Sequence, residues 1–232
     1  MLHSTELADL GRAFACQKPA AMLIAYEQEF RRMREAPFTL LEIGVKKGGS
    51  LRMWEAYFPH ARIIGVDIKP SKLEGLSDRV RLLTGDQGDP AFLEALVRDH
   101  GPFGIVIDDG SHMAEHQRVT FETLFPDVVD GGLYVIEDMH SGYQSGYNPT
   151  GEPPAVEYLA GLAPFLCLST RDPERTAPGF LASRTPAQIA CGSRIARIAF
   201  ARRTAIIETH CELTGPPWDS MQRLARDAAE AL

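Results

Sequence analysis

Five apolar segments alternate with helical segments across the first 140 residues, and this alternation most limits what the chain can fold into. Each segment is a continuous apolar run, which is typical of a strand buried on both faces. The expected strands are 38–45, 61–68, 79–86, 103–110 and 133–138, and the expected helices between them include 48–58, 90–100 and 113–125. Repeated strand–helix alternation predicts a parallel sheet covered by helices on both faces.

The ends of the chain predict further elements around this sheet. Residues 5–35 have helical spacing with a break at "CQKP", and 155–163 is expected to be a helix before irregular structure around "STRDPERTAPG". Residues 193–210 read as two strands joined by a turn near Arg202 and Arg203, and "DSMQRLARDAAEAL" (219–232) reads as an amphipathic helix. We therefore expect an α/β fold whose parallel sheet is closed by an antiparallel hairpin.

Composition excludes several classes of protein. The 232 residues are 44% hydrophobic, enough for a large core in one α/β domain. The net charge of −7 disfavours nucleic acid and anionic membranes as partners, because both require a basic surface. The N-terminus does not resemble a signal peptide, and no apolar run is long enough to span a membrane. The four cysteines are far apart and form no CxxC motif, so we expect reduced thiols and a cytoplasmic location.

Every expected parallel strand ends in at least one acidic residue. These residues are Glu42, Asp67, Asp86, Asp108, Asp109, Glu137 and Asp138. Any single one of them could be a helix cap. Because the carboxyl ends of parallel strands lie at one edge, where ligands bind in such sheets, seven carboxylates there would repel one another without a cation. The pattern indicates a positively charged ligand, a metal ion, or both.

The first strand leads into the loop "EIGVKKGGS", which does not match the G-x-G-x-x-G dinucleotide fingerprint. Asp67 lies 23 residues after Gly44, near the spacing of an acid that binds ribose hydroxyls. That spacing suits NAD and S-adenosylmethionine alike. Glu42 favours S-adenosylmethionine, because a carboxylate can pair with its ammonium group and would repel a pyrophosphate.

Asp109, Glu137 and Asp138 follow the fourth and fifth strands, which are expected to be neighbours. Three carboxylates suit a hard divalent cation such as Mg²⁺, although Glu137 and Asp138 could instead only cap a loop. His112 lies three residues after Asp109 on a tight turn, where a neutral imidazole could act as a general base. The alternative is a surface histidine with no catalytic role.

Other residues near this edge are weaker candidates. His140 could line the pocket, and Tyr143 and Tyr147 in "SGYQSGY" could stack on a substrate or could be ordinary loop tyrosines. His116 reads as structural or as a support for the site, and His100 and His210 read as structural.

Three stretches together resemble a known family. "LLEIGVKKGGSLRMWEAYFPHARIIGVDI", "VIDDGSHMAEHQRVTFETLFPDVVDGGLYVIED" and the terminal hairpin are similar to the metal-dependent sugar O-methyltransferases of natural-product biosynthesis. That family includes mycinamicin- and macrocin-type and rhamnosyl O-methyltransferases, with proteins called cephalosporin hydroxylases as relatives. The resemblance covers residues 38–140 closely and 193–210 loosely, and the pairing of DDGSH with GGLYVIED is its most specific part.

The resemblance implies a Rossmann-like class I S-adenosylmethionine methyltransferase fold with a mostly parallel seven-stranded sheet. It implies Mg²⁺-dependent methylation of a sugar hydroxyl on a glycosylated natural product or a nucleotide sugar. The implied metal ligands are Asp109, Glu137 and Asp138, with His112 as the base. The implied cofactor contacts are Glu42, Gly44, Lys46, Asp67, Asp86, Gln87 and Asp108.

One segment departs from the family pattern. Many relatives carry a T-D-K-type segment and a His-Tyr element that help to cover the cofactor, and here "CQKPAAMLIAY" matches at Lys18 and, more loosely, at Tyr26. We expect residues 1–37 to be a helical lid segment and 38–232 to be the catalytic domain. The departure leaves open a relative that binds S-adenosylmethionine without transferring methyl groups, and NAD-dependent oxidation is a more distant alternative. The sequence identifies neither the acceptor nor whether the chain forms a homo-oligomer.

Overall fold

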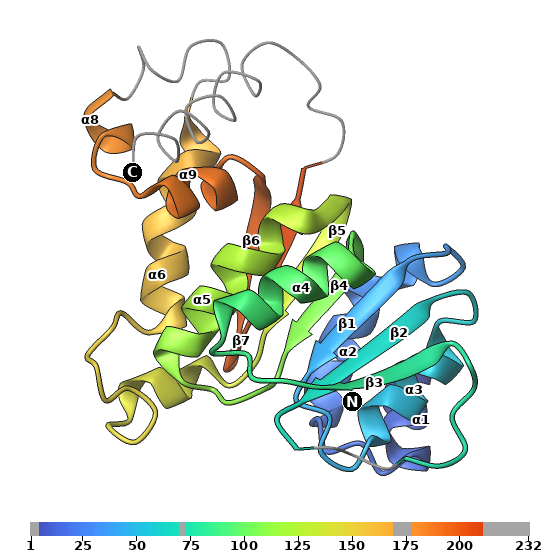
Figure 1. Ribbon diagram of the computed structural model, residues 1–232. Helices are drawn as coiled ribbons and strands as arrows, with labels where there is room; N and C mark the ends of the chain where they lie inside the picture. Colours follow the sequence, from blue (N-terminus) through green and yellow to red (C-terminus); the bar gives the residue numbers. More distant parts are fainter. Residues whose placement is uncertain (1–4, 70–72, 169–177, 211–232) are drawn as a thin grey trace.

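The computed structural model describes residues 5–69, 73–168 and 178–210. Within them, seven strands form one sheet in the order β3-β2-β1-β4-β5-β7-β6 (Figure 1). They are β1 (Thr39–Ile43), β2 (Arg62–Asp67), β3 (Val80–Thr84), β4 (Phe103–Asp108), β5 (Val128–Ile136), β6 (Ile195–Ala201) and β7 (Thr204–Thr209). The first five are parallel, and β7 pairs antiparallel with both β5 and β6. The predicted α/β fold with a closing hairpin is confirmed.

Helices cover both faces of the sheet. One face holds α1 (Glu6–Ala13), α2 (Ala20–Phe30) and α3 (Gly49–Tyr57); the other holds α4 (Pro90–His100), α5 (Ala114–Leu124), α6 (Ala155–Leu162) and α9 (Pro186–Gly192). Shorter helical turns are η1 (Arg31–Met33), η2 (Phe125–Asp127), η3 (Met139–Tyr143), η4 (Ala163–Cys167) and α8 (Pro178–Leu181). Successive strand residues point to opposite faces, so Leu40 joins one apolar core and Leu41 the other.

The N-terminal helices are part of the core. Leu7, Leu23, Tyr26 and Phe30 are buried against strand and α3 residues on one face of the sheet. The helices predicted on both sides of "CQKP" are therefore present, and their apolar faces are needed to cover the sheet. The proposal that they also act as a lid stays a prediction.

The fifth strand differs from its predicted bounds. It begins at Val128 and includes Gly131 and Gly132, whereas the expected strand was 133–138. Gly131 has φ +71°, and the pairing with β4 shifts register at this point. Glycine allows this backbone conformation, so the strand continues through an irregularity instead of ending. The predicted helix at 219–232 lies outside the described residues.

Two other sequence-based expectations concern cysteines and membranes. Cys16, Cys167 and Cys191 have free thiols. Among the residues that the structure describes, no helix is both long and apolar enough to cross a membrane.

The sheet brings its parallel strand ends together through one close backbone contact. Gly44 follows β1 with φ +92°, and a Cβ there would lie 2.0 Å from the carbonyl oxygen of Asp109, which follows β4. Asp109 in turn donates its backbone N–H to the carbonyl of Ile43 at 2.9 Å. A side chain at position 44 would force apart the two loops that carry Asp109 and Lys46.

We predict that Gly44→Ala lowers the free energy of unfolding by more than about 3 kcal/mol, because it combines a left-handed backbone with a backbone clash. Gly75→Ala is the matched control, because Gly75 has φ +75° but no atom within 4 Å of an added Cβ. It should cost only about 1–2 kcal/mol. Urea unfolding of both variants measures the difference, and equal losses would show that the contact with Asp109 is unimportant.

Candidate active site

A buried lysine lies at the centre of the acidic strand ends. The Lys18 ammonium is 2.6 Å from Glu137 Oε1, 2.8 Å from Asp109 Oδ2 and 3.2 Å from Glu42 Oε1. Its side chain is only 4% exposed, and Glu42 is wholly buried. Lys18 belongs to the short segment between α1 and α2, so the N-terminal part of the chain supplies the cation for carboxylates at the ends of β1, β4 and β5.

Electrostatics keep this lysine charged. Burial alone would lower the pKa of Lys18, but Glu137, Glu42 and Asp109 together raise that pKa well above its ordinary value. Burial raises the pKa of Glu42, and Lys18 and the hydroxyl of Ser50, which donates to Glu42 Oε2 at 2.7 Å, oppose that rise. One ammonium thus contacts three carboxyl groups whose mutual repulsion would otherwise keep them apart, although burial still raises the pKa of Glu137 to about 7.

A second group of side chains faces the other side of Asp109. His112 Nε2 lies 4.0 Å from Asp109 Oδ1 and 3.8 Å from Asp138 Oδ2. Donor atoms of these three residues all lie within 4.8 Å of one another, so they could hold a metal ion. His112 and Asp138 both have a left-handed backbone, with φ of +60° and +50°. Such strain in residues other than glycine gathers at functional sites.

The imidazole of His112 is suited to accept a proton. Burial lowers its pKa below the ordinary histidine value, while Asp109 and Asp138 oppose that shift. The ring is therefore mainly neutral at pH 7, as a general base requires. Its Nδ1 is buried with no hydrogen-bond partner among the described residues.

Gln87 and Asp108 support the turn that carries His112. Asp108 Oδ1 accepts hydrogen bonds from Gln87 Nε2 at 3.0 Å and from the Gly110 N–H at 3.3 Å. Gln87 Oε1 accepts from the Ser111 N–H at 2.6 Å. Asp108 is wholly buried, and this burial raises its pKa to about 6. The structure therefore places these two predicted cofactor contacts behind the turn, while the second oxygen of Asp108 has no hydrogen-bond partner among the described residues.

Asp67 organises the glycine loop. Its Oδ2 accepts from the N–H groups of Val45 and Lys46 at 3.0 and 2.9 Å, and its Oδ1 accepts from Lys69 N–H at 3.1 Å. Asp86 is exposed and accepts from the Gly88 N–H at 2.8 Å. Asp67 thus shapes the loop that contains Gly44 and Lys46, and Asp86 only closes a local turn here.

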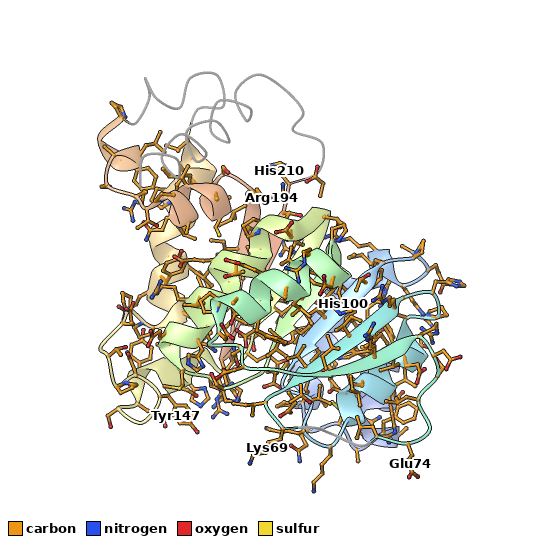
Figure 2. All side chains as sticks on the ribbon, viewed as in Figure 1. Lys69, Glu74, His100, Tyr147, Arg194 and His210 are labelled. Carbon is orange, nitrogen blue, oxygen red and sulfur yellow. The ribbon has the colours of Figure 1, made fainter. Side chains whose placement is uncertain are left out.

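The predicted substrate residues lie at the rim. His140 Nδ1 is 3.7 Å from Asp138 Oδ1. Tyr143 is 63% exposed, and its hydroxyl donates to Glu157 on α6 at 3.0 Å. The ring of Tyr147 lies 6.5 Å from that of His112. In Figure 2, Tyr147 and Lys69 lie along the lower edge of the molecule, whereas His100, Arg194 and His210 lie higher, which agrees with a structural reading of those two histidines.

Two cavities meet at this edge. A small one of about 40 Å³ lies between the glycine loop and residues 15–18, and a large one of about 560 Å³ lies between α2 and the β6–β7 turn. Four residues line both cavities: Gln17, Lys18, Lys46 and Asp109. The small cavity has the place expected for a cofactor, and the large one reaches Glu137 and Asp138.

Comparisons with known proteins identify similar enzymes. Residues 41–139 match the model of the family described as "Methyltransferase domain". The 8-demethyl-8-(2-methoxy-alpha-L-rhamnosyl)-tetracenomycin-C 3'-O-methyltransferase of Streptomyces olivaceus is 44% identical over 171 residues. The mycinamicin VI 2''-O-methyltransferase of Micromonospora griseorubida is 46% identical over 136 residues. Residues 41–139 thus match the methyltransferase domain family, and the chain is similar to the sugar O-methyltransferases of natural-product biosynthesis.

A solved relative confirms the fold. The MycE methyltransferase of the mycinamycin biosynthetic pathway, solved in complex with Mg, SAH and mycinamycin VI, is 31% identical with a TM-score of 0.74. That alignment covers 93% of this chain and 57% of MycE. The chain therefore has the class I S-adenosylmethionine methyltransferase fold, as the resemblance implied.

The relatives are longer than this chain. The matched regions cover 68% of this chain and 43% of the tetracenomycin enzyme, and 55% of this chain and 34% of the mycinamicin enzyme. The matched regions thus span less than half of the length of these curated relatives.

Sequence reasoning did not include Lys18 among the site residues. The sequence singles out Lys18 only as a match to the family's T-D-K-type segment, since a lysine between two helices is usually exposed. The available signal was electrostatic: seven acids at one edge need a cation, and the break at "CQKP" places a lysine in a loop that can reach them.

We predict that Lys18→Met lowers the free energy of unfolding by roughly 3–5 kcal/mol, the usual cost of breaking a buried ion pair by removing one partner. Lys47→Met removes the same charge from an exposed position on the glycine loop and should change stability by less than about 0.5 kcal/mol. Urea unfolding in EDTA compares the two variants. Equal stability of both would contradict a structural role for the Lys18 cluster.

Proposed function

We propose that this chain is an S-adenosylmethionine-dependent and Mg²⁺-dependent O-methyltransferase. Its acceptor is a sugar hydroxyl of a glycosylated natural product or a nucleotide sugar. The observation that carries the proposal is the meeting of Asp109, His112 and Asp138 at the carboxyl edge of this fold, within reach of the glycine loop. The solved relative MycE, whose complex contains Mg, SAH and mycinamycin VI, supports it.

The residues present suit the methyl donor. Glu42 Oε1 is buried without a hydrogen-bond donor, although Lys18 lies at ion-pair distance, so it can accept from an ammonium group. Val45 and Lys46, held by Asp67, shape the loop that faces the small cavity. S-adenosylmethionine would supply an electrophilic methyl group on a sulfonium. We assign the binding of this cofactor to Glu42, Gly44, Lys46 and Asp67. Contact of the cofactor with Asp86, Gln87 and Asp108 stays a prediction.

The donor set also suits a hard divalent cation. Carboxylate oxygens of Asp109 and Asp138 face the same space, and such ligands select Mg²⁺ over softer metals. Glu137 lines the same large cavity, and its Oε1 contacts the Lys18 ammonium. Its predicted role as a third metal ligand is supported only by its place in the lining of this cavity. A divalent cation bound here would lower the pKa of an acceptor hydroxyl.

His112 is the proposed general base. Its Nε2 faces Asp109 and Asp138, and its lowered pKa leaves it free to accept the proton of the acceptor hydroxyl. The strained turn, held by Gln87 through Ser111, fixes where this nitrogen lies. The remaining contribution is alignment of the acceptor oxygen with the methyl group.

The proposed enzyme acts on a small molecule in the cytoplasm. The three described cysteines are free thiols, which suits a reducing compartment. The relatives named above act on rhamnosyl tetracenomycin C and mycinamicin VI, and this is the support for a glycosylated acceptor. Homo-oligomer formation and contacts of Tyr143 and Tyr147 with the acceptor stay predictions.

We predict that the protein forms S-adenosylhomocysteine from S-adenosylmethionine when Mg²⁺ and a deoxysugar glycoside are present. EDTA should abolish turnover, and His112→Ala should lower it by at least about 100-fold, the usual contribution of a general base. His116→Ala is the control: His116 lies on the adjoining helix α5, with Nδ1 3.0 Å from Ser111 Oγ, and its loss should leave turnover largely intact. Full activity in EDTA would exclude the metal role, and full activity of His112→Ala would exclude the base.

The pH dependence gives a separate prediction. Because the pKa of His112 is lowered, the protonated and inactive form accumulates only below about pH 6.5. The ratio kcat/KM should therefore rise with pH, with a midpoint below about 6.5, and reach a plateau by pH 7.5. His112→Gln should lose this rising limb, and His116→Gln should keep it. A midpoint above the ordinary histidine value would contradict a buried neutral base.

A further inference from the structure

The large cavity has room for more than one sugar ring. Its volume of about 560 Å³ falls within the range of pockets for drug-sized ligands. Its floor is acidic, with Asp109, Glu137 and Asp138, and one wall is an apolar stretch of α2 that includes Met22 and Ala25. The turn between β6 and β7 also lines this cavity.

A backbone hydrogen bond joins this turn to the segment that follows the acidic residues. Ala201 and Thr204 pair across it, and Arg203 has a left-handed backbone conformation with φ +68°. The carbonyl oxygen of Arg203 accepts a hydrogen bond from the N–H of Met139 at 3.0 Å. Met139 directly follows Asp138, so Arg202 and Arg203 stand beside the proposed metal ligands.

The turn presents hydrogen-bond donors that lack protein acceptors. Arg202 and Arg203 are exposed, and neither guanidinium forms an ion pair with any residue that the structure describes. Arg197 on β6, by contrast, forms ion pairs with Glu29 and Glu208. The hydroxyl of Thr204, a residue only 2% exposed, also lines the cavity and has no partner in the described part of the chain.

We propose that the β6–β7 turn is an anion subsite, and that the acceptor carries a phosphate or carboxylate group next to the methylated sugar. The inference rests on the proposed function and names its substrate class. Sugar hydroxyls are donors and suit the acidic floor, whereas an anionic group would be repelled there. The turn offers that group two guanidinium groups and one hydroxyl, and charge-assisted hydrogen bonds of this kind are the strong ones.

The experiment compares three acceptors that share one sugar: phenyl α-L-rhamnoside, 4-carboxyphenyl α-L-rhamnoside and dTDP-L-rhamnose. Binding to the full chain is measured by calorimetry with S-adenosylhomocysteine and Mg²⁺ at constant ionic strength. We expect at least one anionic acceptor to bind about 10-fold more tightly than the neutral one, since a hydrogen bond to a charged group contributes about that much. The carboxylate and diphosphate arms identify which source of negative charge the site prefers.

The double variant Arg202→Gln/Arg203→Gln should reduce this preference to within about twofold and leave the neutral acceptor unaffected. Arg197→Gln, which alters an arginine already paired with two glutamates, should retain the preference. The proposal is wrong if no anionic acceptor binds more tightly than the neutral one, or if the preference survives in the double variant. Methyl transfer to the neutral rhamnoside is assayed separately, so failure of the methyltransferase proposal would be seen independently of anion preference.

Discussion

The ion cluster around Lys18 is the constraint on which the rest of the site depends. Three carboxylates converge because parallel strands end at one edge, and the burial of Glu42 and Glu137 makes their charges costly without a cation. A single ammonium within 3.2 Å of all three allows the strand ends to remain close. The same contact holds residues 15–18 over the glycine loop, where a Cβ on Gly49 would lie 2.8 Å from the Phe14 carbonyl oxygen. The N-terminal helices are thus fixed to the site by charge as well as by their apolar faces.

Lys18 also separates the carboxylate oxygens into two groups: some contact its ammonium, and the others face His112. Asp109 gives Oδ2 to the ammonium and turns Oδ1 toward His112. Asp138, one residue after Glu137, turns toward His112 and the large cavity. One side of the cluster is therefore a neutralised structural core, and the other remains negative where a divalent cation and hydroxyl groups can bind. Arg202 and Arg203 add positive charge to the lining of the same cavity, which therefore carries both signs of charge.

The sequence predicted most of the fold and the edge at which the site lies. Continuous apolar runs specify buried parallel strands, and parallel strands bring their terminal acids together, so the convergence of Asp109 and Asp138 followed from pattern alone. The sequence pattern did not predict the direction in which each side chain points. Asp108 is adjacent to Asp109 and points into the interior, where Gln87 holds it, because neighbouring residues at a strand end face opposite sides. Lys18 lies in a loop whose path depends on how two helices pack, and periodicity carries no information about such a path.

The position of a bound divalent cation tests this view of the site most directly. Crystals grown with S-adenosylhomocysteine and Mn²⁺ would locate the ion by its anomalous scattering. We expect one peak in contact with carboxylate oxygens of Asp109 and Asp138 next to His112, with the Lys18 ammonium still bound between Glu42 and Glu137. A peak at the position of the Lys18 ammonium with that side chain displaced, or no peak at Asp109 and Asp138, would contradict it.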